Sequence, residues 1–192
     1  MIALTGKVAL VTGATGGIGF EVSKRLGEDG FTVIMNGLDE KLGAACVKEL
    51  TKAGLTVEFL CFDVTDEDAV NTNVQSIGLK YGKIDVVVNN AGGLGGRSRF
   101  EDMTTEFYKG VMALNLDSTF YVSRAAIPYL KAGSNATIVN YTSNAGWNAG
   151  GPGAGIYGTS KAGVHAITRA LAKDLAEYGI RVNAVSPGTI DT

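Results

Sequence analysis

Residues 8–19 read Val8-Ala9-Leu10-Val11-Thr12-Gly13-Ala14-Thr15-Gly16-Gly17-Ile18-Gly19. The apolar residues at the start predict a buried strand, and the glycines predict a tight turn into a helix. We expect Gly13 to permit the turn, Gly17 to let a pyrophosphate approach the backbone, and Gly19 to allow close packing of the helix on the strand. The helix N-terminus would offer unpaired N–H groups to phosphates. The spacing G-x-x-x-G-x-G is a weak signal alone, but its place at the first strand–helix junction favours a nucleotide site.

The rest of the chain alternates short β-branched runs with longer helical ones. The predicted strands are continuous apolar runs, typical of parallel strands buried on both faces, and span 7–12, 32–36, 57–62, 84–89, 137–141 and 181–185. The predicted helices span 18–29, 40–53, 66–81, 104–130 and 155–178. Several of them end at a glycine, as C-terminal caps do: Gly30, Gly54, Gly82 and Gly179. With right-handed crossovers, this order predicts one α/β domain over residues 1–192, a doubly wound, Rossmann-like parallel sheet with helices on both faces.

Composition narrows the class of protein. The chain has 192 residues, is 45% hydrophobic and carries a net charge of -2, so nothing in its charge favours nucleic acid or an anionic membrane as a partner. Cys46, Cys61 and the single histidine, His165, fit neither a disulfide framework nor a zinc pattern, and we expect no metal site. The first residues leave no room for a signal peptide, and no apolar run approaches the length of a membrane span. We therefore expect a cytoplasmic protein.

Tyr157 and Lys161 form a second informative pattern. Residues four apart on a helix share one face, and a neighbouring ammonium favours the phenolate, so the pair could supply a general acid/base. The alternative is an exposed helical face with an aromatic residue and a charge. The pair lies about 140 residues after the glycine-rich turn, and this association with a nucleotide motif favours the chemical interpretation.

Together these motifs resemble the short-chain dehydrogenase/reductase family. They are T-G-x-x-x-G-I-G at 12–19, Asn89-Asn90-Ala91-Gly92 after the fourth strand, and Tyr157 with Lys161. Two further segments agree, Leu114-Asn115-Leu116 and Pro187-Gly188-Thr189-Ile190-Asp191-Thr192. Each motif alone would be weak, but together they follow the family's order over nearly the whole chain.

The resemblance implies a role for each matching residue. Tyr157 would be the acid/base, Lys161 would assist it and bind the nicotinamide ribose, and Asn115 would hold a water linking Lys161 to solvent. The alternative for Asn115 is a helix-interior asparagine that faces water. Asp63 and Val64 would contact the adenine, Asn90 would brace the central strands, and the segment from Pro187 would hold the nicotinamide carboxamide. The expected cofactor contacts are Gly13, Thr15, Gly16, Gly17, Ile18, Gly19, Leu38, Asp63, Val64, Asn90, Ala91, Gly92, Tyr157, Lys161, Pro187, Gly188, Ile190 and Thr192.

The serine of the family requires a choice of register. It usually stands thirteen residues before the tyrosine, where this chain has Asn144. Residues 138–146 nevertheless resemble the family's serine segment with Ser143 in register, and the glycine-rich stretch 150–155 can absorb one extra residue. We therefore expect Ser143 to hydrogen-bond the reacting oxygen.

Other residues near these motifs have two interpretations. Arg97 and Arg99 could meet an anionic substrate or be solvated loop charges, and solvation is the more usual case. Trp147 could line the pocket or pack against the protein. His165 follows Lys161 by one helical turn, and we expect it to be a helix-packing residue.

The turn after the second strand bears on the choice of cofactor. NADP-dependent members of the family usually carry an arginine here or before the second glycine of the loop, but this chain has Leu38 and Gly16. The aspartate usual in NAD-dependent members is also missing, because Gly37 aligns with it. Asp39 and Glu40 would repel a 2′-phosphate if they point inward, and the one cation available there is Lys41, so we favour NAD over NADP.

The predicted function is that of an oxidoreductase that interconverts a secondary alcohol and a ketone with NAD(P). Substrates of the family include 3-oxoacyl thioesters, steroids, sugars and small hydroxyacids. A non-catalytic nucleotide-binding sensor or scaffold of the same fold is the alternative, and the intact Tyr, Lys, Ser and Asn set argues against it. The family usually continues beyond the position of Thr192, so we expect a C-terminally truncated part of a longer protein, and a homotetramer.

Overall fold

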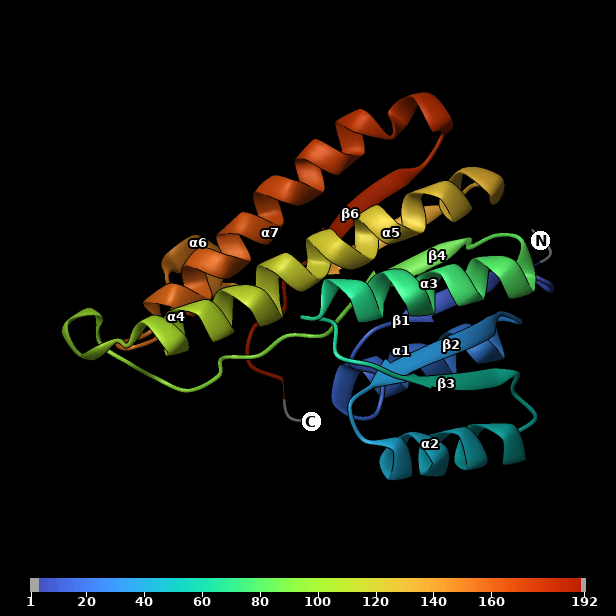
Figure 1. The fold of residues 1–192 in the computed structure, drawn as a ribbon, viewed down its shortest axis with the longest axis horizontal. Helices are drawn as coiled ribbons and strands as arrows, with labels where there is room; N and C mark the ends of the chain where they lie inside the picture. Colours follow the sequence, from blue (N-terminus) through green and yellow to red (C-terminus); the bar gives the residue numbers. More distant parts are fainter. Residues whose placement is uncertain (1–3, 191–192) are drawn as a thin grey trace.

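Six parallel strands form one sheet in the computed structural model, which describes residues 4–190. The strands are β1 (Val8–Val11), β2 (Thr32–Gly37), β3 (Val57–Cys61), β4 (Val86–Asn89), β5 (Thr137–Tyr141) and β6 (Arg181–Val185). Their order in the sheet is β3-β2-β1-β4-β5-β6 (Figure 1). The direction of winding therefore reverses between β1 and β4, which is where open α/β sheets bind ligands. The predicted parallel sheet is confirmed, with the bounds of four of the six strands shifted by one or two residues.

Helices cover both faces of the sheet (Figure 1). On one face, α1 (Gly17–Glu28) and α2 (Glu40–Lys52) pack over Ala9 and Val11 of β1. On the other face, α3 (Glu67–Tyr81), α5 (Ser118–Ala132) and α7 (Gly155–Asp174) pack over Val8 and Leu10. Successive residues of β1 thus enter different cores, because side chains alternate along a strand. This is why the strands read as continuous apolar runs.

Two predicted helices end or divide differently from the expectation. The predicted helix 104–130 is divided into α4 (Thr105–Met112), a π-helical turn (Ala113–Asp117) and α5, which continues to Ala132. The predicted helix 155–178 ends as α7 at Asp174, and a 3₁₀ turn (Ala176–Tyr178) follows it. Two short elements were not predicted, a 3₁₀ turn (Phe100–Asp102) and α6 (Ala145–Asn148), because three or four residues carry no periodic apolar pattern.

The expected glycine caps lie where the sequence placed them. Gly82 ends α3 with a φ of 72°, in the left-handed region, and its N–H donates to the carbonyl of Gly78. The other three predicted caps also have positive φ. Each helix therefore stops just before the strand that follows it. No helix within residues 4–190 combines the length and apolarity that crossing a membrane requires.

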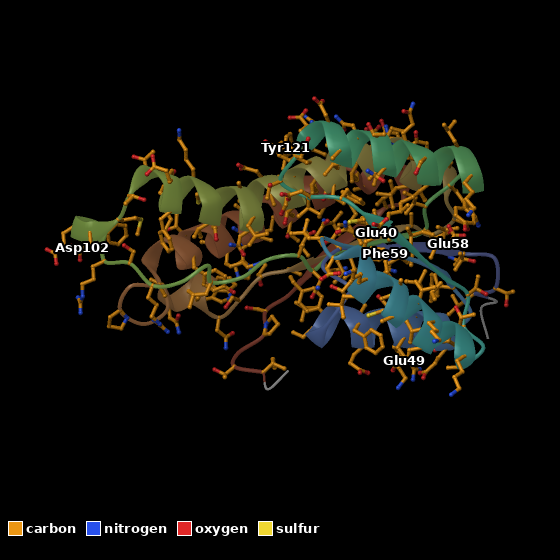
Figure 2. All side chains as sticks on the ribbon, turned by 60° about the horizontal axis from the view of Figure 1, so that its bottom comes forward. Glu40, Glu49, Glu58, Phe59, Asp102 and Tyr121 are labelled. Atoms are coloured by element: carbon orange, nitrogen blue, oxygen red, sulfur yellow. The ribbon has the colours of Figure 1, made fainter. Side chains whose placement is uncertain are left out.

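Close packing of α2 on β3 holds the turn that follows β2. Gly43 of α2 lies over the ring of Phe59, where any side chain would collide with the ring. Figure 2 labels Phe59 close to Glu40, the first residue of α2. The carboxylate of Asp39 caps this helix by accepting hydrogen bonds of 2.9 Å from the N–H groups of Lys41 and Leu42. The turn is thereby held at the carboxyl end of β2.

Candidate active site

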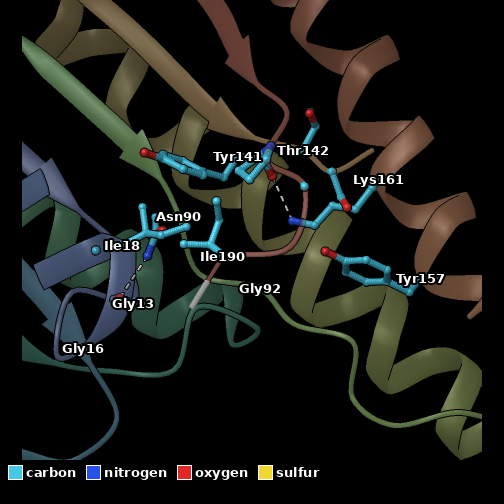
Figure 3. Close-up of a pocket in the computed structure, with 14 residues that line it drawn as sticks. Gly13, Gly16, Ile18, Asn90, Gly92, Tyr141, Thr142, Tyr157, Lys161 and Ile190 are labelled. Carbon is cyan, nitrogen blue, oxygen red and sulfur yellow. Dashed lines mark hydrogen bonds between the residues drawn. The ribbon is translucent and has the colours of Figure 1, made fainter. Parts of the chain in front are cut away.

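Two adjoining pockets lie at the carboxyl ends of the strands. The tyrosine pocket has a volume of about 360 Å³, and the Leu38 pocket one of about 290 Å³. Gly13 and Gly92 line both, so the two pockets meet between β1 and β4. The remaining lining of the tyrosine pocket is Gly16, Ile18, Gly19, Asn90, Tyr141, Thr142, Ser143, Tyr157, Lys161, Pro187, Gly188 and Ile190 (Figure 3). The remaining lining of the Leu38 pocket is Thr15, Asn36, Gly37, Leu38, Asp39, Phe62, Asp63, Val64, Ala91 and Leu114.

Hydrogen bonds lock the glycine-rich turn to the segment after β4. The Thr12 hydroxyl accepts from the N–H of Asn90 at 3.1 Å and from that of Ala91 at 3.0 Å. In return, Nδ2 of Asn90 donates to the carbonyl of Thr12 at 3.0 Å and to that of Gly13 at 2.9 Å, and the second bond is drawn in Figure 3. These bonds join the turn after β1 to the segment after β4. Thr12 was not among the predicted site residues, because its hydroxyl acts only on a segment 78 residues away.

The glycines of the turn make a cradle in front of α1. Gly13 has a φ of 59°, and a Cβ on it would lie 2.9 Å from Cα of Ala91. A Cβ on Gly19 would lie 2.5 Å from Nδ2 of Asn90, whereas the space around Gly16 is open. Gly17 is the first residue of α1, has a φ of 49°, and lines the groove between α1 and α2. Gly16 lines both that groove and the tyrosine pocket, at the helix N-terminus that an entering phosphate would meet, and the role expected of Gly17 stays a prediction.

Tyr157 and Lys161 both project from α7 into the tyrosine pocket (Figure 3). Nζ of Lys161 lies 5.9 Å from the centre of the Tyr157 ring and donates a hydrogen bond of 2.8 Å to the carbonyl of Tyr141. The lysine side chain is buried, and no carboxylate forms an ion pair with it among residues 4–190. Burial lowers the pKa of Lys161 to about 8. The pair thus shares one pocket, as expected for residues four apart on a helix.

Asn115 lies beside this pair, in the π-helical turn. Its Oδ1 accepts from the N–H of Gly93 at 3.0 Å, and its Nδ2 donates to the carbonyls of Gly93 and Val111, both at 2.9 Å. A Cβ on Gly92 would lie 2.8 Å from Oδ1 of Asn115 and 2.9 Å from Nζ of Lys161. Only glycine at 92 therefore leaves room for both groups. Asn115 is fully buried, and the water-facing alternative does not describe it.

The structure separates Ser143 from Asn144. Ser143 lines the tyrosine pocket, and its Oγ accepts a hydrogen bond of 3.1 Å from the N–H of Ala145. Asn144 is absent from the lining of both pockets. Its N–H donates to the carbonyl of Pro187 at 3.1 Å, and its Nδ2 would lie 3.2 Å from a Cβ on Gly188. Asn144 therefore contacts the turn after β6, while Ser143 lines the pocket.

The Leu38 pocket carries acidic side chains and no basic ones among its lining residues. Asp39 caps α2, and Asp63 accepts two hydrogen bonds of 2.8 Å from Thr65. The side chain of Asn36, not singled out as a site residue, joins the ends of β2 and β3 through a 2.8 Å bond to the carbonyl of Phe62. A dianionic group would find no positive partner here.

Some predicted residues lie outside this arrangement. Thr192 is beyond the described residues. Arg97 lines neither pocket, and its guanidinium donates to the carbonyl of Pro152 at 2.9 Å. Trp147 is 70% exposed and stacks on His165. Tyr141 and Thr142 also line the tyrosine pocket and were not predicted. The carbonyl of Tyr141 receives the lysine from α7, and a contact made by the backbone leaves no mark in the sequence.

Comparison with known proteins agrees with this geometry. The family described as short chain dehydrogenase matches residues 7–192. A 3beta-hydroxysteroid dehydrogenase of Mediterraneibacter gnavus is 41% identical over 186 residues, which cover 97% of this chain and 67% of that protein.

Two solved structures are also similar. An NADH-dependent reductase responsible for alginate metabolism, complexed with NAD, has a TM-score of 0.91 and 36% identity, over 98% of this chain and 80% of that one. An actinorhodin polyketide ketoreductase with NADPH has a TM-score of 0.90 and 37% identity, over 96% and 71%. The chain therefore belongs to the short-chain dehydrogenase/reductase family and is an NAD(P)-dependent oxidoreductase of CH–OH and ketone groups.

Proposed function

We propose that the protein interconverts a secondary alcohol and a ketone, with Tyr157 as the acid/base. The observation that carries this proposal is that Ser143, Tyr157 and Lys161 line one pocket together with Gly16 and Ile18 at the start of α1. The glycine cradle and the helix N-terminus fit a pyrophosphate, and the adjoining Leu38 pocket continues from it. NAD(P) supplies the hydride chemistry when bound.

The chain's own residues would move the proton. In the reducing direction, the Tyr157 hydroxyl donates its proton to the carbonyl oxygen, and the Ser143 hydroxyl donates a hydrogen bond to the same atom. The buried ammonium of Lys161 favours the tyrosinate that remains and could bind ribose hydroxyls. Asn115 ties the Gly92-Gly93 segment to the π-helical turn beside the lysine, through its bonds to Gly93. The role of a bound water at Asn115 stays a prediction.

NAD is the cofactor that the Leu38 pocket supports better. Leu38 occupies the position where a phosphate-binding arginine would stand, and the nearest carboxylates belong to Asp39 and Asp63. A Cβ on Gly37 would lie 2.7 Å from Cγ2 of Thr15, so an aspartate there would displace the threonine. The carboxylates that line the Leu38 pocket thus belong to Asp39 and Asp63 and not to residue 37. We infer that a 2′-phosphate is disfavoured by charge.

A homotetramer is the assembly we propose, through α4, α5 and α7. Tyr108 on α4 and Phe120 on α5 are exposed aromatic side chains, and such groups favour burial in an interface. Light scattering on the purified protein should give four times the mass of one chain. A stable monomer would contradict this proposal.

The cytoplasm is the compartment we propose. Cys46 and Cys61 are both free, which agrees with a reducing environment. Cell fractionation followed by immunoblotting should recover the protein with cytoplasmic markers. Recovery with the membrane or secreted fraction would contradict it.

A panel of carbonyl compounds tests the proposed activity. Purified protein would be mixed with NADH or NADPH and with 3-oxoacyl thioesters, ketoses, steroid ketones or keto acids, and the absorbance of the reduced nicotinamide would be followed. We expect turnover with at least one class, and none with the matched Tyr157→Phe variant. Cofactor binding without turnover across the panel would instead favour the sensor or scaffold alternative.

A further inference from the structure

The single tryptophan and the single histidine of the chain stack on each other. The ring centres of Trp147 and His165 lie 4.3 Å apart, with 46° between their planes. Trp147 belongs to α6, four residues after Ser143, and His165 lies on α7, four residues after Lys161. The stack therefore joins the segment that carries Ser143 to the helix that carries Tyr157.

Around this stack, α6 rests on α7 almost backbone to backbone. A Cβ on Gly146 would lie 2.9 Å from Cδ2 of His165 and 3.0 Å from the backbone carbon of Lys161. One turn earlier on α7, a Cβ on Gly158 would lie 2.8 Å from the carbonyl of Ala145 and 2.9 Å from Cα of Ala149. Of the atoms nearest to such a Cβ on Gly146, the one from a side chain belongs to the imidazole of His165.

Ala149 adds a sign that the segment is held under constraint. It ends α6 with a φ of 63°, in the left-handed region that residues with a Cβ rarely adopt. A conformation of this kind costs about 1 kcal/mol or more and persists only where surrounding contacts hold it. The close approach of Gly158 on α7 to the backbone of Ala149 is a contact of this kind.

The polar groups of His165 also point to a holding role. Within residues 4–190, Nε2 of the imidazole is buried without a hydrogen-bond partner. Burial and the charge of Arg169 lower the pKa of His165, while a hydrogen bond to the backbone of Ser143 acts in the opposite direction. The imidazole lies against Gly146 and Trp147 of α6.

We propose that His165 is a positioning residue, which holds residues 143–147 against α7 and so fixes the Ser143 hydroxyl relative to Tyr157. The inference rests on the proposed function. Tyr157 and Lys161 share a helix, so their relation is set locally, whereas Ser143 arrives from the end of β5. Its distance from Tyr157 depends on how 143–147 rests on α7. Displacement of a reacting group by about 1 Å can cost up to roughly 100-fold in rate.

A double-mutant cycle with Ser143 tests whether His165 affects turnover through the position of Ser143. His165→Ala should lower kcat about tenfold and leave the KM of the cofactor within about twofold, because the cofactor pockets do not contain His165. In a Ser143→Ala background, the same change should have no further effect on kcat. His165→Gln, which keeps a donor, should recover part of the loss. Lys173→Ala, an exposed change on the last turn of α7, is the matched control and should be silent.

Equal losses in both backgrounds would show that His165 does not act through Ser143 and would overturn the proposal, as would an unchanged kcat in His165→Ala.

The fluorescence of Trp147 tests the holding contact without any turnover. Time-resolved anisotropy of the wild-type protein should show the indole moving with the whole molecule. In His165→Ala, a fast component should appear and acrylamide should quench the indole more efficiently, with Lys173→Ala again as the control. Unchanged anisotropy in His165→Ala would overturn the proposal. If wild type turned over no ketone while this fast component still appeared, the proposed function would fail and the holding contact would stand.

Discussion

Nζ of Lys161 donates a hydrogen bond of 2.8 Å to the backbone carbonyl of Tyr141. A neutral carbonyl compensates only part of the cost of burying an ammonium, and burial accordingly lowers the pKa of Lys161 to about 8. The pocket therefore contains a cation that would gain from additional oxygen ligands. The ribose hydroxyls of a nicotinamide cofactor are ligands of this kind.

The burial of Lys161 predicts how stability changes with pH. Below pH 8, Lys161 is protonated in both the folded and unfolded states, and the cost of burying its charge is constant. Between pH 8 and its ordinary pKa of 10.5, the unfolded state holds more protons, so the free energy of unfolding contributed by this residue rises with pH. The rise is at most about 3 kcal/mol.

Urea unfolding of the cofactor-free protein at pH 8 and pH 10 measures this effect, with Lys161→Met as the reference that removes it. The increase should be larger in wild type, because all other titrating groups are shared. The same pH dependence in both proteins would mean that Lys161 keeps its ordinary pKa.

Tyr157→Phe should lower kcat by at least about 100-fold, the usual contribution of general acid–base catalysis. Cofactor affinity should change little, whereas Lys161→Ala should damage both turnover and cofactor binding. Steady-state kinetics and fluorescence titration separate the two effects. Tyr178→Phe, on the exposed 3₁₀ turn after α7, is the matched control. Near-normal turnover by Tyr157→Phe would remove the proposed mechanism.

Ser143→Ala should lower kcat strongly, by about 100-fold, because the developing alkoxide loses a positioned donor. Asn144→Ala should have a mild effect, since Asn144 contacts the turn at Pro187 and Gly188 and not the pocket. Measuring both variants on one substrate ranks the residues. If Asn144→Ala were the more damaging change, the register that places Ser143 at the reacting oxygen would be wrong.

Calorimetry should show that NADH binds more tightly than NADPH. Leu38→Arg should shift the preference toward NADPH by supplying a charged partner for the 2′-phosphate. Leu42→Arg is the matched control, because Leu42 is exposed on α2 but lines the groove between α1 and α2 and not the Leu38 pocket. A wild-type preference for NADPH of about tenfold, or 1.4 kcal/mol, would contradict our interpretation of this turn.

The sheet could be predicted because its causes are local. Apolar runs such as Val86 to Val88 indicate strands buried on both faces. Gly82 indicates the end of a helix, because glycine readily adopts the left-handed conformation found there. Once strands and helices alternate, right-handed crossovers make the strands parallel, so the carboxyl ends of all strands lie at the same edge of the sheet. The motifs at Gly13, Asn90 and Tyr157 could therefore be expected in one region from their positions along the chain.

Other features depended on contacts between distant segments. No local pattern shows that Lys161 reaches the carbonyl of Tyr141, that Thr12 receives two N–H groups from the segment after β4, or that Asn115 lies in a π-helical turn. The four residues of α6 form a helix where they rest on α7, with Trp147 stacked on His165. Secondary structure and motif order follow from interactions within a few residues. The placement of individual polar groups follows from packing, which sequence spacing does not encode.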